Sequence, residues 1–178
     1  TMIYALLDHP RRDRYDLGSL RNVLYGASAI APDRLRQALK VFGAVFTQFF
    51  GQTEAPMALT TLSREAHVVE DPARQQQVLT SAGLPTYQTE IRLVDDEGRD
   101  VPHGAAGEVI ARSPNMMSGY LDNPQATAAA IRDGWLYTGD VARIDEEGLI
   151  TIVDRKKDVI ISGGFNVYPR EVEDALFE

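Results

Sequence analysis

Apolar positions between residues 32 and 42 recur with the spacing of an α-helix. One helical face collects the apolar side chains Leu35, Ala38, Leu39 and Phe42. Pro32 suits the first helical turn and Gly43 suits the stop, so the pattern predicts an amphipathic helix. The β-branched and aromatic run 45–50 predicts a strand that ends in a glycine turn at Gly51. A helix followed by a strand indicates an α/β layer in this part of the chain.

The pattern changes after a polar, weakly periodic stretch at 64–77. Short strands separated by turn residues are then expected at 91–93, 108–111, 141–144 and 149–153. The last two flank Asp145-Glu146-Glu147-Gly148, which is a strong hairpin signal. Asn123-Pro124 opens an alanine-rich helix that we expect to stop near Gly134. This half therefore predicts a small, mostly β subdomain.

The final segment combines an apolar run at 159–161, the glycine pair Gly163-Gly164 and a helix that begins at Pro169. We expect three parts: an α/β part at 1–75, a β-rich part at 76–154 and a short third part at 155–178. Because the chain starts on an apolar run and ends within a helical pattern, we expect both ends to be cuts in a longer protein.

Composition narrows the classes of partner. The chain has 178 residues, 44% of them hydrophobic and 25% charged, which is typical of a globular protein. A net charge of −8 without a basic stripe argues against binding to nucleic acid or to an anionic membrane. No apolar run is long enough to cross a membrane. The absence of cysteine fits a cytoplasmic location, and small molecules are the expected partners.

Chemistry-bearing residues gather at Phe50-Gly51-Gln52-Thr53-Glu54. This segment offers a ring face for a flat base, close backbone approach at glycine, a hydroxyl for a phosphate oxygen and a carboxylate for Mg²⁺. A strand end followed by a polar turn would explain the same residues without any ligand.

A second candidate lies about 85 residues later. Asp140 follows Gly139, and a carboxylate at the mouth of a strand can accept hydrogen bonds from two ribose hydroxyls. Arg155 adds a guanidinium for ribose or phosphate. A Gly-Asp turn and a solvated charge run are the alternatives. The three histidines, His9, His67 and His103, are far apart and show no metal-ligand spacing.

The joint order of these motifs resembles the adenylate-forming superfamily of acyl-CoA synthetases, luciferases and peptide-synthetase adenylation domains. The similar segments are 26–30, 50–54, 137–140, the hinge motif 154–158 and the loop and helix at 162–173, which together span nearly the whole chain. The resemblance implies a mixed α/β fold: part of a large N-terminal domain, with an α/β layer and a small distorted β-barrel, then the start of a C-terminal α+β domain.

The resemblance also implies roles for single residues. Phe50 would lie against adenine, Thr53 would contact phosphate and Glu54 would bind Mg²⁺. Asp140 and Arg155 would hold the ribose, and Lys157 would be the hinge. The implied catalytic residues are thus Thr53, Glu54 and Lys157, and the ligand-binding residues are Gly26, Ala27, Ser28, Phe50, Gly51, Gln52, Thr53, Asp140, Arg155, Gly163 and Gly164. The last two would line the pantetheine tunnel.

The activity implied is formation of acyl-CoA from a carboxylate, ATP and CoA by way of an acyl-adenylate. Neutral side chains at Ala27, Ala29, Ala55 and Met57 favour a fatty or aromatic acid. The family's phosphate-binding Lys loop and its late catalytic Lys have no counterpart in these residues, so we predict that the chain alone is inactive. Two alternatives stay open: an adenylation domain that loads a carrier protein, and a non-catalytic AMP-binding fragment that self-associates through exposed core.

Overall fold

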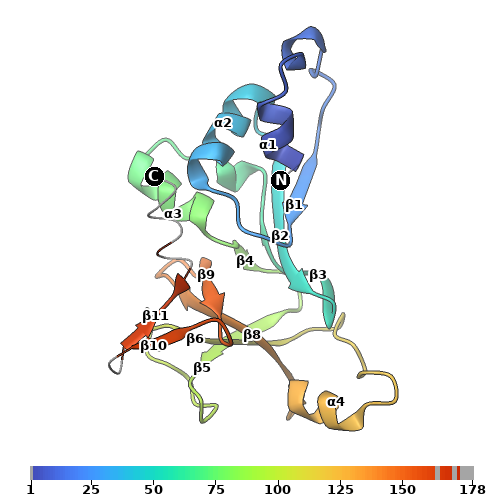
Figure 1. The fold of residues 1–178 in the computed structure, drawn as a ribbon, viewed down its shortest axis with the longest axis vertical. Helices are drawn as coiled ribbons and strands as arrows, with labels where there is room; N and C mark the ends of the chain where they lie inside the picture. The colour runs from blue at the N-terminus through green and yellow to red at the C-terminus, as the bar shows by residue number, and fades with distance from the viewer. Residues whose placement is uncertain (1, 163–164, 170–171, 173–178) are drawn as a thin grey trace.

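The computed structural model describes residues 2–162, 165–169 and 172. Within them the chain forms an α/β part, a β-rich part below it and a small hairpin at the side (Figure 1). The mixed α/β prediction is therefore confirmed. Two short 3₁₀ turns, Arg12–Arg14 and Glu65–His67, lie in the connections of the α/β part.

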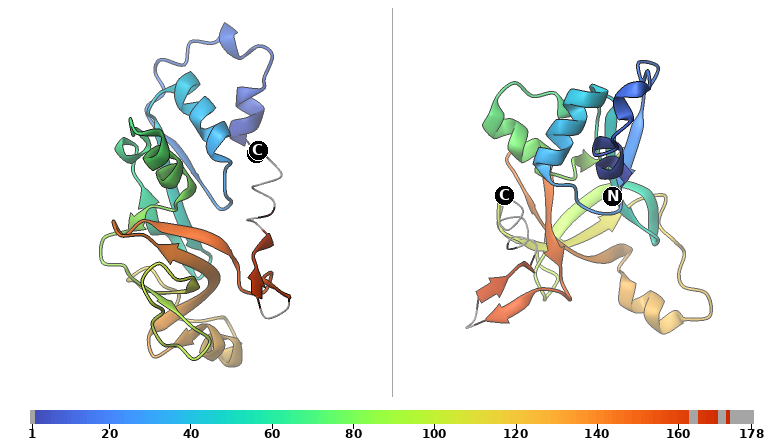
Figure 2. Two further views of the ribbon diagram at one scale, coloured as in Figure 1. Left: turned by 90° about the vertical axis from the view of Figure 1, so that its left-hand side faces the viewer. Right: turned by 45° about the horizontal axis from the view of Figure 1, so that its top comes forward.

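The α/β part is built on a four-stranded sheet in the order β1-β2-β3-β4. The strands are β1 (Val23–Gly26), β2 (Phe46–Gln52), β3 (Ala55–Leu62) and β4 (Leu84–Pro85), and only the β1–β2 pair is parallel. Helices α1 (Met2–Leu7) and α2 (Pro32–Phe42) pack together beside this sheet (Figure 2). The predicted bounds of α2 are confirmed, and its Leu35 and Ala38 join Phe46 of β2 in the core.

The predicted glycine turn at Gly51 is wrong. Strand β2 continues through Gly51 to Gln52, and the ladder with β3 shifts register between Phe50 and Gln52. A Cβ on Gly51 would lie 2.7 Å from the carbonyl oxygen of Met57. The glycine is needed because the two backbones approach closely at this irregularity, which is a common use of glycine within a strand.

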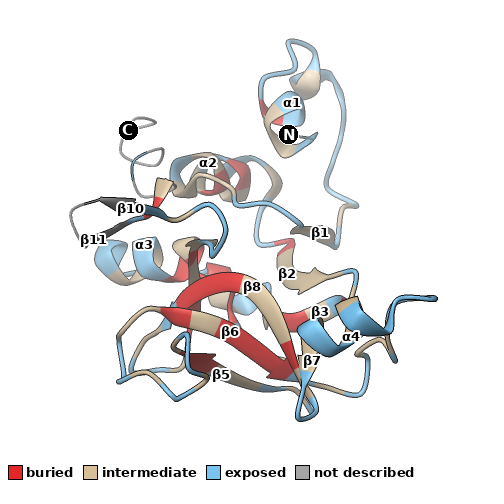
Figure 3. Cartoon of the chain, turned by 60° about the horizontal axis from the view of Figure 1, so that its bottom comes forward, coloured by how far each residue is buried: buried red, intermediate tan, exposed pale blue. Residues whose placement is uncertain are grey.

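The β-rich part is an antiparallel sheet of five strands that forms a half-barrel, in agreement with the small distorted β-barrel expected. The strands are β5 (Glu90–Val94), β6 (Gly107–Arg112), β7 (Ile131–Arg132), β8 (Trp135–Ile144) and β9 (Ile150–Arg155). Figure 3 shows the buried residues concentrated on β6 and β8, at the centre of this sheet. The predicted hairpin around residues 145–148 is confirmed as β8–β9.

The alanine-rich helix is present but ends earlier than predicted. Helix α4 (Pro124–Ala130) begins after Asn123, whose side chain caps it, and stops before β7. Asp133 and Gly134 both have positive φ, 50° and 78°, and form the tight turn between β7 and β8. Gly134 therefore serves the hairpin, while pairing of residues 131–132 with β8 ends the helix.

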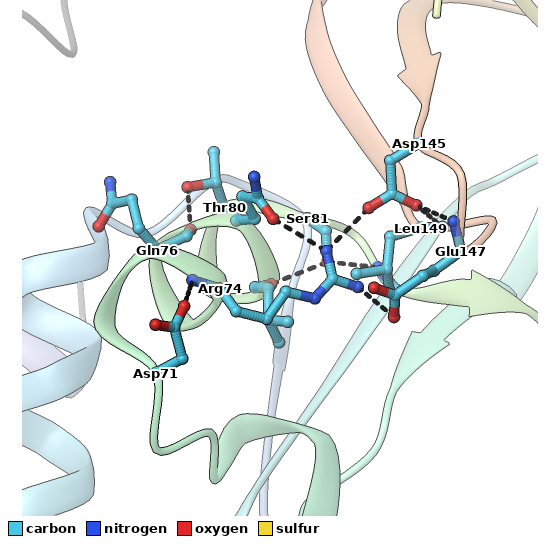
Figure 4. A network of polar contacts seen from close by, with 11 residues as sticks. Asp71, Arg74, Gln76, Thr80, Ser81, Asp145, Glu147 and Leu149 are labelled. Carbon is cyan, nitrogen blue, oxygen red and sulfur yellow. Dashed lines mark hydrogen bonds and ion pairs between the residues drawn. The ribbon is translucent and has the colours of Figure 1, made fainter. Parts of the chain in front are cut away.

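Helix α3 (Pro72–Thr80), which lies between β3 and β4 in the chain, was not predicted. Asp71 accepts a hydrogen bond from the Arg74 backbone N–H, so it caps the helix. The Arg74 guanidinium reaches the β8–β9 turn, with Nη1 3.0 Å from Asp145 Oδ2 and Nη2 2.6 Å from Glu147 Oε2 (Figure 4). Burial raises the pKa of Asp145, but hydrogen bonds from Arg74 and from two backbone amides of the turn outweigh it and hold that pKa below its usual value.

The hairpin of β10 (Ile160–Ser162) and β11 (Phe165–Val167) follows β9. Gly163, Gly164 and most of the helix expected after Pro169 lie outside the described residues. The expected boundary between residues 75 and 76 falls inside α3, and the division into three parts stays a prediction. No helix in the described ranges is long and apolar enough to cross a membrane.

Candidate functional site

A cavity of about 220 Å³ lies where the two sheets meet. Its walls come from the loop after β1, from β2, from the end of α3 and from β8 and β9. The lining residues are Gly26, Ala27, Ser28, Ala29, Ile30, Gln48, Phe49, Phe50, Gly51, Gln52, Leu79, Thr80, Ala82, Asp140, Ile152, Asp154 and Arg155. Segments more than 100 residues apart in sequence therefore share one site.

The first wall depends on close contact between β1 and β2. Gly26 pairs with Phe49 in the parallel ladder, and a Cβ on Gly26 would lie 2.2 Å from the Phe49 carbonyl oxygen. Ala27 follows with φ of 65°, a left-handed conformation that is uncommon outside glycine. The chain thus leaves the sheet in a sharp turn, and the loop 27–30 covers one end of the cavity.

Behind this wall runs a buried polar chain that the sequence did not reveal. His67 is fully buried, its Nδ1 lies 2.7 Å from the Ser63 carbonyl oxygen and its Nε2 lies 2.8 Å from the Tyr25 hydroxyl. Burial lowers the pKa of His67, so the neutral ring donates from Nδ1 and accepts from Tyr25 at Nε2. The Tyr25 oxygen also lies 3.4 Å from the side-chain amide of Gln48 in the cavity wall. His67 is thus a core residue whose two ring nitrogens both have hydrogen-bond partners.

Asp140 provides the buried charge of the second wall. It lies within β8 and pairs with Arg155 of β9, so the expected position at the mouth of a strand is wrong. The β8–β9 ladder shifts register shortly after Asp140, between Val141 and Ala142. Only 12% of its side chain is exposed, and burial raises its pKa. Arg155 Nε, 3.6 Å from Asp140 Oδ1, lowers that pKa and the nearby Glu108 raises it.

Thr53 and Glu54 lie in the turn between β2 and β3, outside the residues that line the cavity. The Glu54 carboxylate accepts a hydrogen bond from the Tyr120 hydroxyl at 2.6 Å, which raises the pKa of Tyr120. The Glu54 carbonyl oxygen accepts from the Met117 backbone N–H at 2.7 Å. These two bonds attach the turn to the segment before α4, a contact that motif spacing alone did not indicate.

The β2–β3 turn offers a divalent cation one carboxylate, that of Glu54. Across the described ranges, no three acidic or histidine side chains converge as a metal cluster. Mg²⁺ commonly takes one or two carboxylates, with substrate phosphates and water completing its octahedron. Glu54 fits that kind of site, in which the nucleotide itself supplies most ligands.

Eight of the thirteen candidate residues line the cavity: Gly26, Ala27, Ser28, Phe50, Gly51, Gln52, Asp140 and Arg155. Lys157 lies in the exposed turn after β9, two residues beyond Arg155. Gly163 and Gly164 lie outside the described residues. The cavity thus pairs an aromatic and small-residue wall with a carboxylate and a guanidinium, a combination suited to a base and a polyhydroxylated sugar.

The sequence of this chain is similar to those of known nucleotide-binding enzymes. A family model described as AMP-binding enzyme matches residues 1–121. The medium/long-chain-fatty-acid–CoA ligase FadD8 of Mycobacterium tuberculosis is 47% identical over 178 residues, which are all of this chain and 30% of that protein. The chain therefore spans about a third of the length of this relative.

Two solved structures share the fold over nearly the whole chain. The amide bond synthetase McbA from Marinactinospora thermotolerans superimposes with a TM-score of 0.87 at 40% identity, covering 96% of this chain and 33% of that one. O-succinylbenzoate coenzyme A synthetase from Bacillus subtilis, in complex with ATP and magnesium ion, gives 0.83 at 33% identity, covering 99% and 34%.

Proposed function

Because the chain belongs to the AMP-binding enzyme family, we propose that it forms the nucleotide-binding segment of an ATP-dependent acyl-CoA synthetase. One observation carries the proposal: residues chosen from four separate sequence motifs meet around a single cavity. Independent surface turns would not be expected to converge in this way.

In the proposed complex the base lies on the wall made by the loop after β1 and by Phe50. The ribose hydroxyls donate to Asp140, and Arg155 lies at the rim to hold ribose or phosphate oxygens. A carboxylate with little exposed surface makes a strong charge-assisted acceptor once a ligand replaces its water. Thr53, next to the cavity in the β2–β3 turn, is the proposed phosphate contact.

Glu54 is the proposed Mg²⁺ ligand, and its Tyr120 hydrogen bond holds the carboxylate in place. When bound, Mg²⁺ would neutralise charge on the phosphates of ATP. Magnesium and ATP are bound together by the O-succinylbenzoate relative named above, which supports the same pairing here.

The reaction proceeds by two displacements. A substrate carboxylate oxygen forms a bond to the α-phosphorus of ATP, and the bond from that phosphorus to the bridging oxygen breaks to release pyrophosphate. The CoA thiol then loses its proton, its sulfur bonds to the acyl carbon and AMP leaves. The acyl-adenylate divides one difficult step into two easier ones. Rotation at Lys157 would bring a different set of groups to each step.

The chain alone is expected to show no turnover, because two cationic groups that stabilise phosphate charge in the family have no counterpart in it. Loss of one such group typically costs about 10²-fold or more in rate. Pyrophosphate release by the purified chain with Mg·ATP and a panel of acids should match the enzyme-free blank, and turnover abolished by Asp140→Ala would refute this prediction.

A fatty or aromatic acid is the proposed acyl substrate. Ala27 and Ala29 give the cavity a small, neutral wall, with no acid to pair an amino-acid ammonium in the loop 26–30. The relatives named above include both a medium/long-chain-fatty-acid–CoA ligase and an O-succinylbenzoate coenzyme A synthetase. A carrier-protein thiol in place of CoA is the alternative acceptor.

The alternative to an enzyme is a non-catalytic AMP-binding fragment that self-associates through exposed core residues. Leu121, Tyr87 and Met57 are 91%, 89% and 67% exposed, which is unusual for large apolar side chains and would favour self-association. Light scattering of the purified chain tests this: growth of the particle mass with concentration supports association, and a constant monomer mass contradicts it.

A chimera tests the function itself. These 178 residues would replace the matching segment of the Mycobacterium tuberculosis relative, and acyl-CoA formation would be followed with fatty and aromatic acids, with CoA or a holo-carrier protein as acceptor. We expect CoA-dependent turnover that Asp140→Ala abolishes. A folded chimera that binds neither ATP nor acyl-adenylate would refute the proposal.

A further inference from the structure

Lys156 contacts both the backbone and the acidic groups around Asp140. Its backbone N–H donates to the Gly139 carbonyl oxygen at 2.8 Å. Its ammonium lies 2.8 Å from Glu108 Oε2 and 2.8 Å from Asp96 Oδ1. The same Glu108 accepts a longer bond, 3.3 Å, from the Gly139 backbone N–H. Lys156 and Glu108 therefore hold the peptide groups of the residue directly before Asp140.

The Glu108 side chain is unusual because it is ionisable and only 10% exposed, whereas Asp96 is 82% exposed. A desolvated carboxylate is costly unless a cation or hydrogen-bond donors compensate it. Lys156, 45% exposed, supplies that compensation, and both acids raise its pKa. The contact with Glu108 should matter more than the solvent-screened contact with Asp96.

The positions of Lys156 and Glu108 limit how these two side chains can influence a bound ligand. Gly139 has φ of 74° and lies in the irregular stretch of the β6–β8 ladder, between the paired residues Tyr137 and Val141. Lys156 and Glu108 do not line the cavity, so they act on a ligand only through Asp140. We propose that Lys156 is a positioning residue for nucleotide binding, which fixes Gly139 through Glu108 and shields Asp140 from the charge of that buried carboxylate. This inference rests on the proposed function.

The charged groups that face Asp140 come from several elements. Arg155 of β9 and Glu108 of β6 act on Asp140 directly, and Asp154 of β9 lines the same cavity. Lys156, after β9, contacts Glu108 and also Asp96 in the turn after β5. Replacing Lys156 with methionine removes a positive charge and leaves Glu108 uncompensated. Like charge favours the protonated form of a carboxyl group, so ionised Asp140 becomes harder to maintain as the pH falls.

Binding of AMP by Lys156→Met, measured by calorimetry at pH 6 and pH 8, tests the inference. Relative to wild type at each pH, the variant should lose about threefold to tenfold more affinity at pH 6 than at pH 8. Lys156→Arg keeps the charge and should behave like wild type. The double variant Lys156→Met, Glu108→Gln removes both charges and should recover the wild-type pH ratio. Lys40→Met, an exposed lysine on α2, controls for net charge.

A carbon NMR titration of the Asp140 carboxyl group gives a readout that needs no ligand. Its pKa should be higher in Lys156→Met than in wild type and should return toward wild type in the double variant. Equal Asp140 titrations, or equal loss of affinity at both pH values, would overturn the inference. Wild-type protein that binds no AMP would instead overturn the proposed function, while the NMR titration still decides whether Lys156 controls Asp140.

Discussion

Replacing Asp140 with asparagine is expected to change ligand affinity and stability in opposite directions. The side chain is 12% exposed and its folded pKa is raised, chiefly by burial. Its charge therefore opposes folding of the free protein but favours binding of a ligand with paired hydroxyl groups. Asparagine keeps the shape and removes the charge.

The loss of affinity follows from the hydrogen bonds available. Ionised Asp140 offers two carboxylate oxygens to two ribose hydroxyls, whereas asparagine offers one carbonyl oxygen. A hydrogen bond to a charged group is worth about 1.5–3 kcal/mol, so AMP should bind about 10- to 150-fold more weakly. Arg155, 63% exposed and 3.6 Å away, remains to hold the ligand in part.

The gain in stability depends on pH with a definite sign. Because the folded pKa lies above the unfolded value near 3.8, the folded state holds the Asp140 proton more tightly. The contribution of Asp140 to the stability of the wild type is fully present below about pH 3.8. It is lost as the pH rises through the folded pKa of Asp140. Asp140→Asn should therefore melt higher than wild type at pH 7 and lose that advantage below about pH 3.8.

Thermal melts across this pH range, with calorimetric titration of AMP at pH 7, measure both effects. Asp133→Asn is the matched control, since Asp133 is exposed in the β7–β8 turn at φ of 50°, where asparagine is equally tolerated. A variant that melts lower than wild type at pH 7 would refute the account of Asp140 as a desolvated charge. Unchanged AMP affinity would refute its role in binding.

Three further perturbations test other parts of the structure. Gly83→Ala should destabilise the fold by more than about 2 kcal/mol in a denaturant titration, because Gly83 has φ of 85° and the new Cβ would lie 2.1 Å from the Thr61 carbonyl oxygen. A loss of stability below about 1 kcal/mol would contradict this close packing. Arg74→Met should lower the melting temperature by about 2–4 °C in low salt and by less in about 1 M salt, because salt screens the ion pairs of Arg74 with Asp145 and Glu147. Equal decreases at both salt concentrations would exclude these ion pairs as the cause. Glu54→Gln should remove most of the Mg²⁺ dependence of ATP affinity in calorimetry while AMP binds as before, and an unaltered dependence would rule out Glu54 as a ligand.

The sequence predicted those helices and strands that are specified by residues within the element itself. Helix α2 matches its predicted bounds, because one apolar face and residues suited to its two ends specify it. Helix α3 was missed because its apolar periodicity is weak, although Asp71 and Pro72 carry a usable start signal. The Asp71 cap, the burial of Val78 and Leu79 and the contact of Arg74 with the β8–β9 turn together stabilise this segment as a helix.

The sequence predicted which residues belong to the candidate site, but not how they are arranged in space. Motif order brought together Phe50, Asp140 and Arg155, which do line one cavity. Sequence spacing did not show that Asp140 lies within a long strand, nor that Lys156 pairs with Glu108 across 48 residues. Such contacts depend on strand register, which single-sequence patterns leave undetermined.

Calorimetric titration of the chain with a non-hydrolysable acyl-adenylate analogue tests most directly whether the cavity binds a nucleotide. Calorimetry is preferred to fluorescence because Trp135 contacts the guanidinium groups of Arg92 and Arg112 and does not line the cavity. We predict saturable one-to-one binding that Asp140→Ala abolishes. A chain that is folded by circular dichroism yet releases no heat with the analogue would contradict the central claim.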